Sequence, residues 1–432
     1  MPVAVSWRFP ILVLVGLVAV VIQPTRETVL LWLALSIVLT VVDLLLAVSP
    51  RRLGIQREGG SQVRLGDSGT TALLVTNTGR RTLRGLVRDA WQPSAGATVD
   101  RHRLTLKSGE RRRLTTILVP TRRGDRLADR VTVRSFGPLG LGARQRSFDV
   151  GGVIRALPPF HSRKHLPSRL AALRQLDGRS AVRIRGQGTE FDSLRDYVEG
   201  DDVRSIDWRA TARRQHAVVR TWQPERDRRV ILVLDTSRTS AGRVEDMPRL
   251  DSEMDAALLL AALASRAGDR VDLIAGDRWV RARVGSASRT ALLAELVQAM
   301  SPLEPALLEA SWPTLAAAIA DTSRRRALVV LLTSLEPATI EESLLPTLAT
   351  LTTHHRVVVA SVSDPALTAM AARRGTTAEA YDAAAAERTL TLRQRTADVL
   401  GRLGVTVIDA DPEHLPPRLA DHYLLLKSQG LL

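Results

Sequence analysis

Residues 229–239, RVILVLDTSRT, set the architecture of the second half of the chain. After its leading arginine the segment is an unbroken apolar run, which is typical of a strand buried on both faces of a sheet. Comparable runs recur, with helical segments between them, at 270–275, 327–332, 356–361 and 405–409. Strands that alternate with helices in this way predict a parallel sheet covered by helices. We therefore expect a doubly wound α/β fold for the C-terminal half.

The first of these strands ends in three oxygen-bearing side chains, Asp235, Ser237 and Thr239, spaced D-x-S-x-T. In open α/β sheets, ligands bind beyond the carboxyl ends of the strands. Ser334 follows another strand at the same edge, and Thr314 opens a helix. Carboxylate and hydroxyl oxygens are hard ligands that suit Mg²⁺. The sequence therefore places a candidate ligand site at this edge of the sheet.

The N-terminal part of the chain carries two apolar runs joined by a short polar turn. Residues 9–23 hold no charge, and residues 29–48 hold one, Asp43. The second run has the roughly 20 residues needed to cross a bilayer. The first is shorter and would span by taking in residues 4–7 or by local thinning of the bilayer. We interpret residues 1–50 as a transmembrane helical hairpin with both ends on the same side.

The charge distribution predicts the orientation of this hairpin. The formal net charge is +16, and residues 51–150 alone carry 21 basic and 8 acidic side chains. Because basic residues beside a membrane span stay on the cytoplasmic side, we expect the plasma membrane with both termini in the cytoplasm. The same charge could lie against anionic lipid headgroups. A cleaved signal peptide is the alternative for the first apolar run, although no small-residue cleavage site follows it.

Residues 51–150 change to short runs with partial alternation. Strand-like segments at 71–77, 83–91, 114–119 and 130–136 are separated by glycine-containing turn signals. Short strands at this spacing predict a small β-sandwich. The chain contains no cysteine, which excludes disulfides, thiolate catalysis and cysteine-ligated metals.

Residues 151–228 form a charged junction in which acids and arginines alternate closely. Arginine pairs with carboxylates in a bidentate way, so the segment can hold a specific network of ion pairs. We interpret it as a docking surface or as a latch between two domains. A metal site and acid–base catalysis are the alternatives. The candidate docking residues are Arg195, Asp196, Tyr197, Glu199, Asp201, Asp202, Arg204, Asp207, Trp208 and Arg213.

Residues 188–207, GTEFDSLRDYVEGDDVRSID, together with the following Trp208, resemble the DUF58 family of bacterial membrane proteins. The segments PTRRGDR (120–126) and FGPLGL (136–141) match the pattern of that family's β-domain. Residues 229–432 resemble a von Willebrand factor A domain. The resemblance covers essentially the whole chain, and its central motif is long and specific.

The resemblance also implies a function and a metal site. DUF58 proteins are associated with MoxR-type AAA+ ATPases and are thought to help assemble or mature other proteins. The resemblance therefore implies that the chain is a membrane-anchored adaptor and not an enzyme. The metal site of a von Willebrand A domain would map onto Asp235, Ser237 and Thr239, with Thr314 from a second loop. Ser334 stands where a third-loop aspartate is expected, so Mg²⁺ is implied at a degenerate site with one carboxylate.

Two other classes of function stay open. A membrane-associated hydrolase could use Asp235 and Ser237, or the pair Asp201 and Asp202. Against it, no candidate serine has a plausible histidine base, and no Walker or G-x-S-x-G motif occurs. The basic region could bind nucleic acid, but it has few aromatic side chains for stacking and adjoins the membrane segment. We expect lipid and protein partners rather than nucleic acid.

Overall fold

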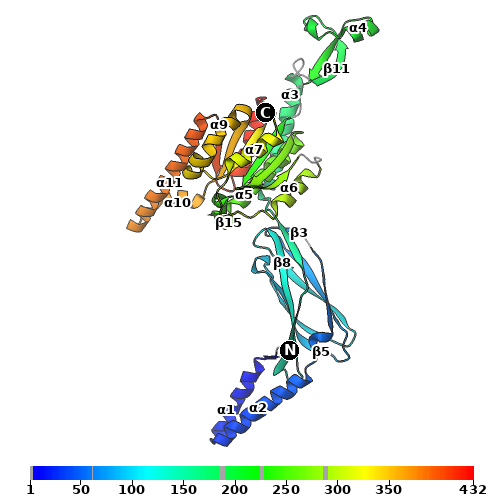
Figure 1. The fold of residues 1–432 in the computed structure, drawn as a ribbon, viewed down its shortest axis with the longest axis vertical. Coiled ribbons are helices and arrows are strands. Elements are labelled where there is room, and N and C mark those ends of the chain that lie inside the picture. The colour runs from blue at the N-terminus through cyan, green and yellow to red at the C-terminus, as the bar shows by residue number, and fades with distance from the viewer. Residues whose placement is uncertain (1–2, 61, 184–189, 224–227, 286–289) are drawn as a thin grey trace. The chain divides into compact units, whose positions relative to one another are not determined.

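The computed structural model describes residues 3–60, 62–183, 190–223, 228–285 and 290–432. The chain divides into two compact units, Met1–Leu157 and Pro158–Leu432. The first unit has a short strand followed by two helices and then further strands, and the second unit alternates helices with strands (Figure 1).

Two apolar helices, α1 (Arg8–Ile22) and α2 (Arg26–Leu46), lie near the start of the first unit. The Thr25 hydroxyl caps α2 by accepting the Thr28 N–H at 3.2 Å. One helical stretch among the described residues, Arg26–Arg52, is long and apolar enough to cross a membrane, and α1 is a shorter apolar helix. Most large apolar side chains of both helices are exposed, which is unfavourable in water. The two helices are therefore suited to a lipid environment.

The chain enters α1 from a strand, β1 (Val3–Val5), which pairs antiparallel with β9 (Gly142–Phe148). The prediction that residues 4–7 lengthen the first span is therefore wrong, because the backbone of Ala4 pairs with Ala143 in this sheet. The helix α1 has 15 residues. At 1.5 Å per residue this gives about 22 Å, less than the roughly 30 Å of a bilayer core. On its own, α1 is too short to cross an undeformed bilayer.

Asp43, near the end of α2, is fully buried and joins the helix to the β-rich region. Its carboxylate accepts the backbone N–H groups of Leu139 at 2.7 Å, Leu141 at 2.7 Å and Gly142 at 2.9 Å. The turn passes so close that a Cβ on Gly137 would lie 2.2 Å from the Asp43 carbonyl oxygen. The one charge in the second apolar run is therefore a structural acceptor that holds a glycine-containing turn against the helix.

The helices α1 and α2 pack through a close contact between Gly16 and Trp32. The indole N–H of Trp32 donates to the Leu12 carbonyl oxygen at 3.0 Å. A Cβ on Gly16 would lie 2.1 Å from Cδ1 of Trp32, so no side chain fits there unless the indole moves. Small residues at helix interfaces allow this kind of close approach in membranes.

Replacing Gly16 by leucine is expected to weaken the packing of α1 on α2. Overpacked interfaces cost about 1–3 kcal/mol, so amide exchange in α1 should become about tenfold faster or more. Hydrogen–deuterium exchange of the full chain in detergent measures this. Val18→Leu is the matched control, because Val18 is 61% exposed on the same helix. Unchanged protection of α1 in Gly16→Leu would contradict the packing.

Two sheets of the first unit share one core. The three-stranded sheet contains β2 (Leu53–Glu58), β4 (Gly69–Asn77) and β7 (Arg111–Leu118). The seven-stranded sheet contains β1 and β9 with β3 (Gln62–Arg64), β5 (Leu83–Trp91), β6 (Arg101–Leu106), β8 (Gly124–Phe136) and β10 (Val153–Leu157). Leu73 and Val75 from the first sheet pack with Leu83, Val87 and Val131 from the second. The four predicted strands are present, and the other strands of this unit were not predicted. In β6 and β9, two arginines each interrupt the apolar pattern.

A buried ion pair also links the two sheets. Arg57 Nη2 lies 2.6 Å from Asp89 Oδ1, and the two side chains are 4% and 0% exposed. Asp89 further accepts the Thr116 hydroxyl at 3.0 Å and the Trp91 indole N–H at 3.1 Å. A buried carboxylate with this many donors is satisfied, so the pair belongs to the framework of this unit.

The second unit is built on a six-stranded sheet in the order β17-β16-β13-β18-β19-β20. The strands are β13 (Arg229–Asp235), β16 (Arg270–Gly276), β17 (Val280–Val284), β18 (Leu328–Leu332), β19 (Arg356–Val362) and β20 (Thr406–Ala410). All pairings are parallel except that of β17 with β16. The structure confirms the parallel sheet that the apolar runs predict, with strand ends within one residue.

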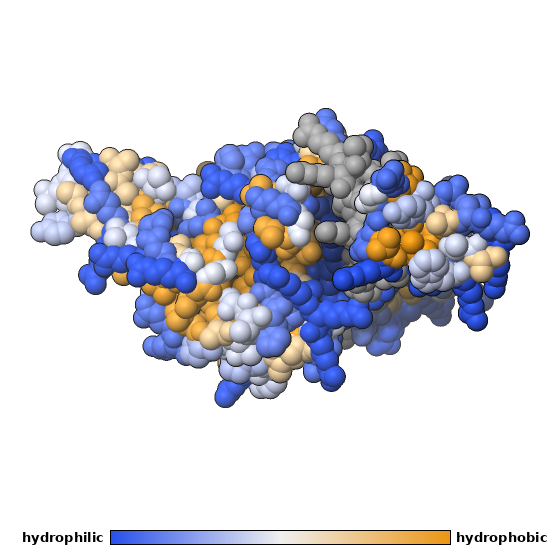
Figure 2. Space-filling model, turned by 90° about the horizontal axis from the view of Figure 1, so that it is seen from above, coloured by the Kyte–Doolittle hydropathy of each residue, from blue (hydrophilic) through white to orange (hydrophobic). Residues whose placement is uncertain are grey.

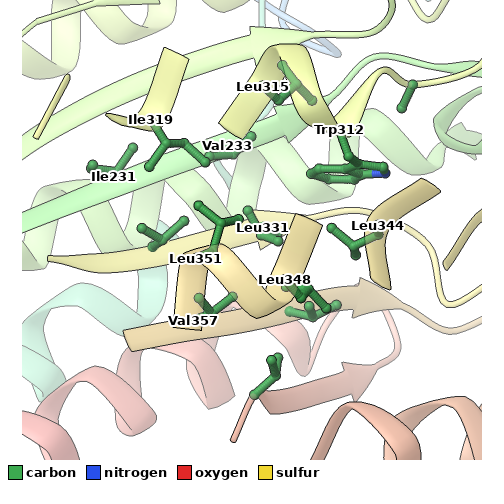
Figure 3. Packing of buried hydrophobic residues seen from close by; sticks show 14 of the residues in the cluster. Ile231, Val233, Trp312, Leu315, Ile319, Leu331, Leu344, Leu348, Leu351 and Val357 are labelled. Atoms are coloured by element: carbon green, nitrogen blue, oxygen red, sulfur yellow. The ribbon is translucent and has the colours of Figure 1, made fainter. Parts of the chain in front are cut away.

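Helices pack on this sheet or on one another. They are α3 (Leu166–Arg183), α5 (Arg249–Arg266), α6 (Leu292–Met300), α7 (Trp312–Thr322), α8 (Pro337–Thr339), α9 (Leu345–His354), α10 (Pro365–Ala372), α11 (Thr377–Arg402) and α12 (Leu415–Ser428). Ile231 and Val233 of β13 pack with Trp312 of α7 and Leu348 of α9 (Figure 3). The helix α5 is buried along almost its whole length.

A small module, residues 190–223, carries all ten candidate docking residues of the charged junction. β11 (Glu190–Asp196) and β12 (Val218–Gln223) pair antiparallel, and α4 (Trp208–Arg214) lies between them in sequence. The first two residues of the motif 188–207 lie outside the described residues. The rest of the motif forms one strand of this hairpin and the turn that leads into α4.

Candidate functional site

The D-x-S-x-T loop folds around the carboxylate of Asp235, which is fully buried at the carboxyl end of β13. Its Oδ1 accepts the Ser237 backbone N–H at 2.8 Å. Its Oδ2 accepts the hydroxyl groups of Thr333 at 2.6 Å and Thr239 at 3.2 Å. The Ser237 and Thr239 hydroxyl oxygens lie 3.1 Å apart. The structure thus brings the three predicted loop residues together, at the edge where the sequence places them.

The sheet register explains why Thr333 reaches Asp235. Leu234 of β13 pairs with Leu332 of β18, so the next residues of both strands lie side by side. Ser334, the predicted third-loop residue, directly follows Thr333 in the sequence and is fully buried. Its hydroxyl makes no hydrogen bond in the described part of the chain. Thr333, the residue directly before the predicted Ser334, makes the contact with Asp235 instead.

Thr314, the predicted second-loop residue, is exposed near the start of α7. Its hydroxyl lies 2.8 Å from that of Ser311. Backbone groups of a neighbouring loop contact the D-x-S-x-T loop in its place, since Ala306 N–H donates to the Thr236 carbonyl at 2.8 Å. Within the described residues, Thr314 makes no hydrogen bond to the Asp235 loop.

A second carboxylate, Glu253 of α5, lies close to Asp235 and was missed in the sequence. It is fully buried, its Oε2 accepts the Ser240 hydroxyl at 3.3 Å, and its Oε1 has no hydrogen-bond partner in the described residues. Burial, followed by repulsion from Asp235, raises the pKa of Glu253 to about 8. Glu253 is therefore largely protonated at neutral pH. An acid inside an Ala/Leu-rich helix was the available signal, because a buried helix seldom carries an acid without a reason.

Burial also raises the pKa of Asp235, and its three hydrogen-bond donors offset part of that effect. Hydroxyl groups and two carboxylates are the donor set that suits a hard divalent cation. The free atoms Ser334 Oγ and Glu253 Oε1 are buried acceptors that such an ion could use. Among the residues that the structure describes, no group of three or more His, Cys, Asp or Glu side chains is arranged to hold a metal.

Arg238 forms the charged rim of this edge. It is half-exposed and pairs with Glu309, and its Nη1 lies 3.8 Å from Glu336. These residues come from three different loops, so the rim ties together the loops that surround Asp235.

In the small module, most of the predicted docking acids are engaged within the module itself. Arg195 lies 2.6 Å from Asp201, and Arg220 lies 2.8 Å from Asp207. The hydrogen bond from Arg195 lowers the pKa of Asp201. Asp207 caps α4 by accepting the Ala210 N–H at 2.9 Å, and this bond is the main cause of its lowered pKa. These acids build the module.

Asp196, Asp202 and Tyr197 of the predicted docking set also have their partners within the module. Asp196 lies 2.8 Å from the His216 ring, and Asp202 accepts the Arg204 N–H at 3.0 Å. Tyr197 is half-buried, and its backbone N–H donates to Ala217. Glu199 is exposed and has no partner in the described residues.

Apolar and basic side chains of the module are left free. Trp208, Val198 and Val203 are 71%, 61% and 61% exposed. Four exposed arginines have no ion pair within the described residues: Arg204, Arg209, Arg213 and Arg214. We call these seven residues the module face. Figure 2 shows apolar patches bordered by hydrophilic residues on one side of the protein.

Curated relatives of the chain have no stated function. Uncharacterized proteins of Mycobacterium tuberculosis and Mycobacterium bovis are each 29% identical to it over 187 residues. The match covers 42% of this chain and 57% of those proteins, so the chain spans little more than half of their length.

Solved structures also resemble parts of the chain. An aerotolerance-related membrane protein from Bacteroides fragilis is 16% identical, with a TM-score of 0.24, over 31% of this chain and 66% of that one. The conserved hypothetical protein BatB from Bacteroides thetaiotaomicron is 12% identical, with a TM-score of 0.30, over 47% of this chain and 99% of that one. Residues 193–399, which run from the small module through the Asp235 loop into α11, match the model of DUF58, a protein family of unknown function.

Proposed function

We propose that the chain is a membrane-anchored adaptor that binds cytoplasmic proteins and catalyses no reaction itself. The partner implied by the resemblance to DUF58 proteins is a MoxR-type AAA+ ATPase or one of its clients. Two surfaces serve for docking in this proposal. One is the module face, and the other is the edge of the von Willebrand A-like sheet around Asp235.

Contacts at both ends of the helical pair support a two-span anchor. The strand β1, before α1, belongs to the same sheet as β9. After α2, the guanidinium of Arg81 donates to the Leu46 carbonyl at 2.9 Å, and that of Arg144 donates to the Leu44 carbonyl at 3.1 Å. Both ends of the hairpin then lie on one side of the membrane. The basic residues that follow favour the cytoplasmic side, with α1 crossing a locally thinned bilayer.

The module face is the observation that carries the docking proposal. Large apolar side chains gain free energy when they leave water, yet Trp208 is 71% exposed. Tryptophan and arginine are the residues that most often dominate protein interfaces. Four arginines without an acidic partner favour a partner surface with acidic groups around an apolar pocket.

The geometry around Asp235 favours docking over hydrolysis. Both carboxylate oxygens already accept hydrogen bonds, and the Ser237 hydroxyl is paired with that of Thr239. In the described residues, Ser237 has no histidine partner that could act as a base. A nucleophile needs such a base within hydrogen-bond reach.

Mg²⁺ is the cofactor that we propose at this edge. Asp235, Ser237 and Thr239 would hold it, together with the free Ser334 hydroxyl. Glu253, which is protonated without the ion, would release its proton when Mg²⁺ binds and would then supply the second carboxylate that the sequence pattern lacks. The ion would supply a positive charge and a coordination position for a carboxylate of the partner protein.

Affinity purification of the full chain from its own membranes, in mild detergent with Mg²⁺ and with or without ATP, tests the proposal. We expect the native chain to recover an AAA+ ATPase, identified by mass spectrometry. Trp208→Ala should reduce that recovery by about tenfold or more, since truncating a central tryptophan costs about 2 kcal/mol or more. Tyr381→Ala is the matched control, because Tyr381 is an aromatic residue that is 76% exposed on α11.

An Asp235→Ala variant separates the two surfaces. Loss of the ATPase in this variant would place a contact at the Asp235 edge, and equal recovery would place it on the module face alone. Equal recovery with Trp208→Ala would contradict docking through the module. Recovery of no ATPase by the native chain would contradict the adaptor proposal.

A further inference from the structure

A cavity of about 260 Å³ lies at the edge of the α/β sheet opposite to Asp235, where the strands begin. Five arginines line it, together with Thr322 and Ser323: Arg229, Arg270, Arg324, Arg325 and Arg326. Arg229 opens β13 and Arg270 opens β16, and the two are directly paired in the sheet register. The other three arginines follow α7 and precede β18. The fold therefore gathers into one cavity basic residues that are far apart in the sequence.

The cavity is strongly basic even after its internal contacts are counted. Arg229 lies 3.3 Å from Asp272 and also donates to the Thr322 carbonyl. Arg270 and Arg325 have partners of their own within the chain. In contrast, Arg324 and Arg326 are exposed and make no ion pair or side-chain hydrogen bond within the described residues. Two guanidinium groups are thus free to bind a ligand.

Arg229 and Arg270 lie side by side in neighbouring strands, and each has a partner within the chain. Concave surfaces lined by one sign of charge concentrate counter-ions. The guanidinium fork matches the geometry of phosphate oxygens and binds them through two parallel hydrogen bonds. A phosphate group is therefore the ligand chemistry that this cavity suits best.

A second cavity adjoins the first and is mostly apolar. It has a volume of about 440 Å³ and shares Ser323 and Arg324 with the arginine cavity. The rest of its lining is three alanines of α7 together with Thr350, Leu351, His354 and His355. A ligand with a phosphate head and a short apolar chain could occupy both. A phosphate carried by a lipid and one carried in solution are therefore the two sources to separate.

We propose that the arginine cavity, lined by Arg229, Arg270 and Arg324–Arg326, is a binding site for a phosphate group. The site is separate from the Asp235 edge and from the module face. It gives the adaptor a second ligand, independent of its protein partner.

Isothermal titration calorimetry of the full chain in non-ionic detergent tests this site. Inorganic phosphate and dihexanoyl phosphatidic acid are the two probes, and dihexanoyl phosphatidylcholine is the control for the lipid chains. We expect phosphate to bind, with affinity that falls as salt is raised. Tighter binding of phosphatidic acid than of phosphate, by about tenfold or more, would assign the site to a lipid phosphate. Equal binding would assign it to a phosphate in solution.

The variant Arg324→Gln/Arg326→Gln should weaken binding of both anionic probes by about tenfold or more, because it removes two charge-assisted contacts. The matched control is Arg388→Gln/Arg395→Gln, which removes the same charge from two exposed, unpaired arginines of α11. That control should bind as the native chain does. Equal weakening in both variants would show that only overall charge matters, and the absence of binding to either probe would overturn the proposal.

Discussion

Replacing Glu253 by glutamine is expected to stabilise the α/β domain by several kcal/mol at pH 8, and to change its stability little at pH 5. The native carboxyl has its pKa raised from 4.5 to about 8 by burial and by the nearby Asp235. A difference of this size between folded and unfolded chains corresponds to up to about 5 kcal/mol at high pH.

The sign follows from proton binding. Between pH 4.5 and about 8 the unfolded chain has released the Glu253 proton and the folded chain still holds it. Because the unfolded state binds fewer protons, the free energy of unfolding falls as the pH rises through this window. Glutamine has the same shape as the protonated acid and does not titrate, so it removes this contribution.

Urea titrations of the full chain at pH 5, 6, 7 and 8, with a chelator present, measure the effect. A short pulse of hydrogen exchange at one common pH then reports the unfolding of α5 and β13 peptides separately from the first unit. Glu342→Gln is the control, because Glu342 is exposed and lies on a different segment. A native chain whose α5 stability does not fall between pH 5 and 8 would contradict the assignment.

Glu253 and the Asp235 loop show which parts of this site could be predicted from the sequence and which could not. The loop of Asp235, Ser237 and Thr239 could be predicted because it is local: it follows an apolar strand with fixed spacing. Glu253 could not, because its proximity to Asp235 depends on how α5 packs against the sheet. The pattern within a helix that is buried all round does not indicate which neighbour each side chain meets.

A similar reason explains why Thr314 and Ser334 make no hydrogen bond to Asp235 in the described residues. Their assignment rested on aligning loops with those of a von Willebrand A domain, and such loops vary in length. The structure places Thr314 in an exposed pair with Ser311 and gives the direct contact with Asp235 to Thr333. Sheet register, which fixes that contact, depends on pairing between strands almost a hundred residues apart.

In the first unit, a short strand could not be predicted because it depends on pairing with a distant segment. β1 has three residues directly before an apolar helix, and its sequence continues the apolar character of that helix. Only its pairing with β9 makes it a strand. The prediction that Ala4 extends the membrane span failed because a partner 139 positions away along the chain takes up its backbone hydrogen bonds.

Replacing Asp43 by leucine is expected to release the turn at residues 139–142 from α2. Three backbone N–H groups, those of Leu139, Leu141 and Gly142, would lose their acceptor in a buried place. Each unsatisfied group costs about 1–3 kcal/mol, so the local loss is about 3 kcal/mol or more. Amide exchange at these positions should become about a hundredfold faster or more, as measured by hydrogen–deuterium exchange of the full chain in lipid nanodiscs.

Two variants make this test specific. Asp43→Asn keeps one acceptor oxygen and should give an intermediate rate. Glu27→Gln removes a carboxylate from the other end of α2, where it is exposed, and should leave the turn protected. Unchanged protection in Asp43→Leu would mean that Arg81 and Arg144, which bind carbonyl groups at the end of α2, hold the two parts together without Asp43. Loss of protection instead makes this buried carboxylate the link that holds the β-rich region against α2.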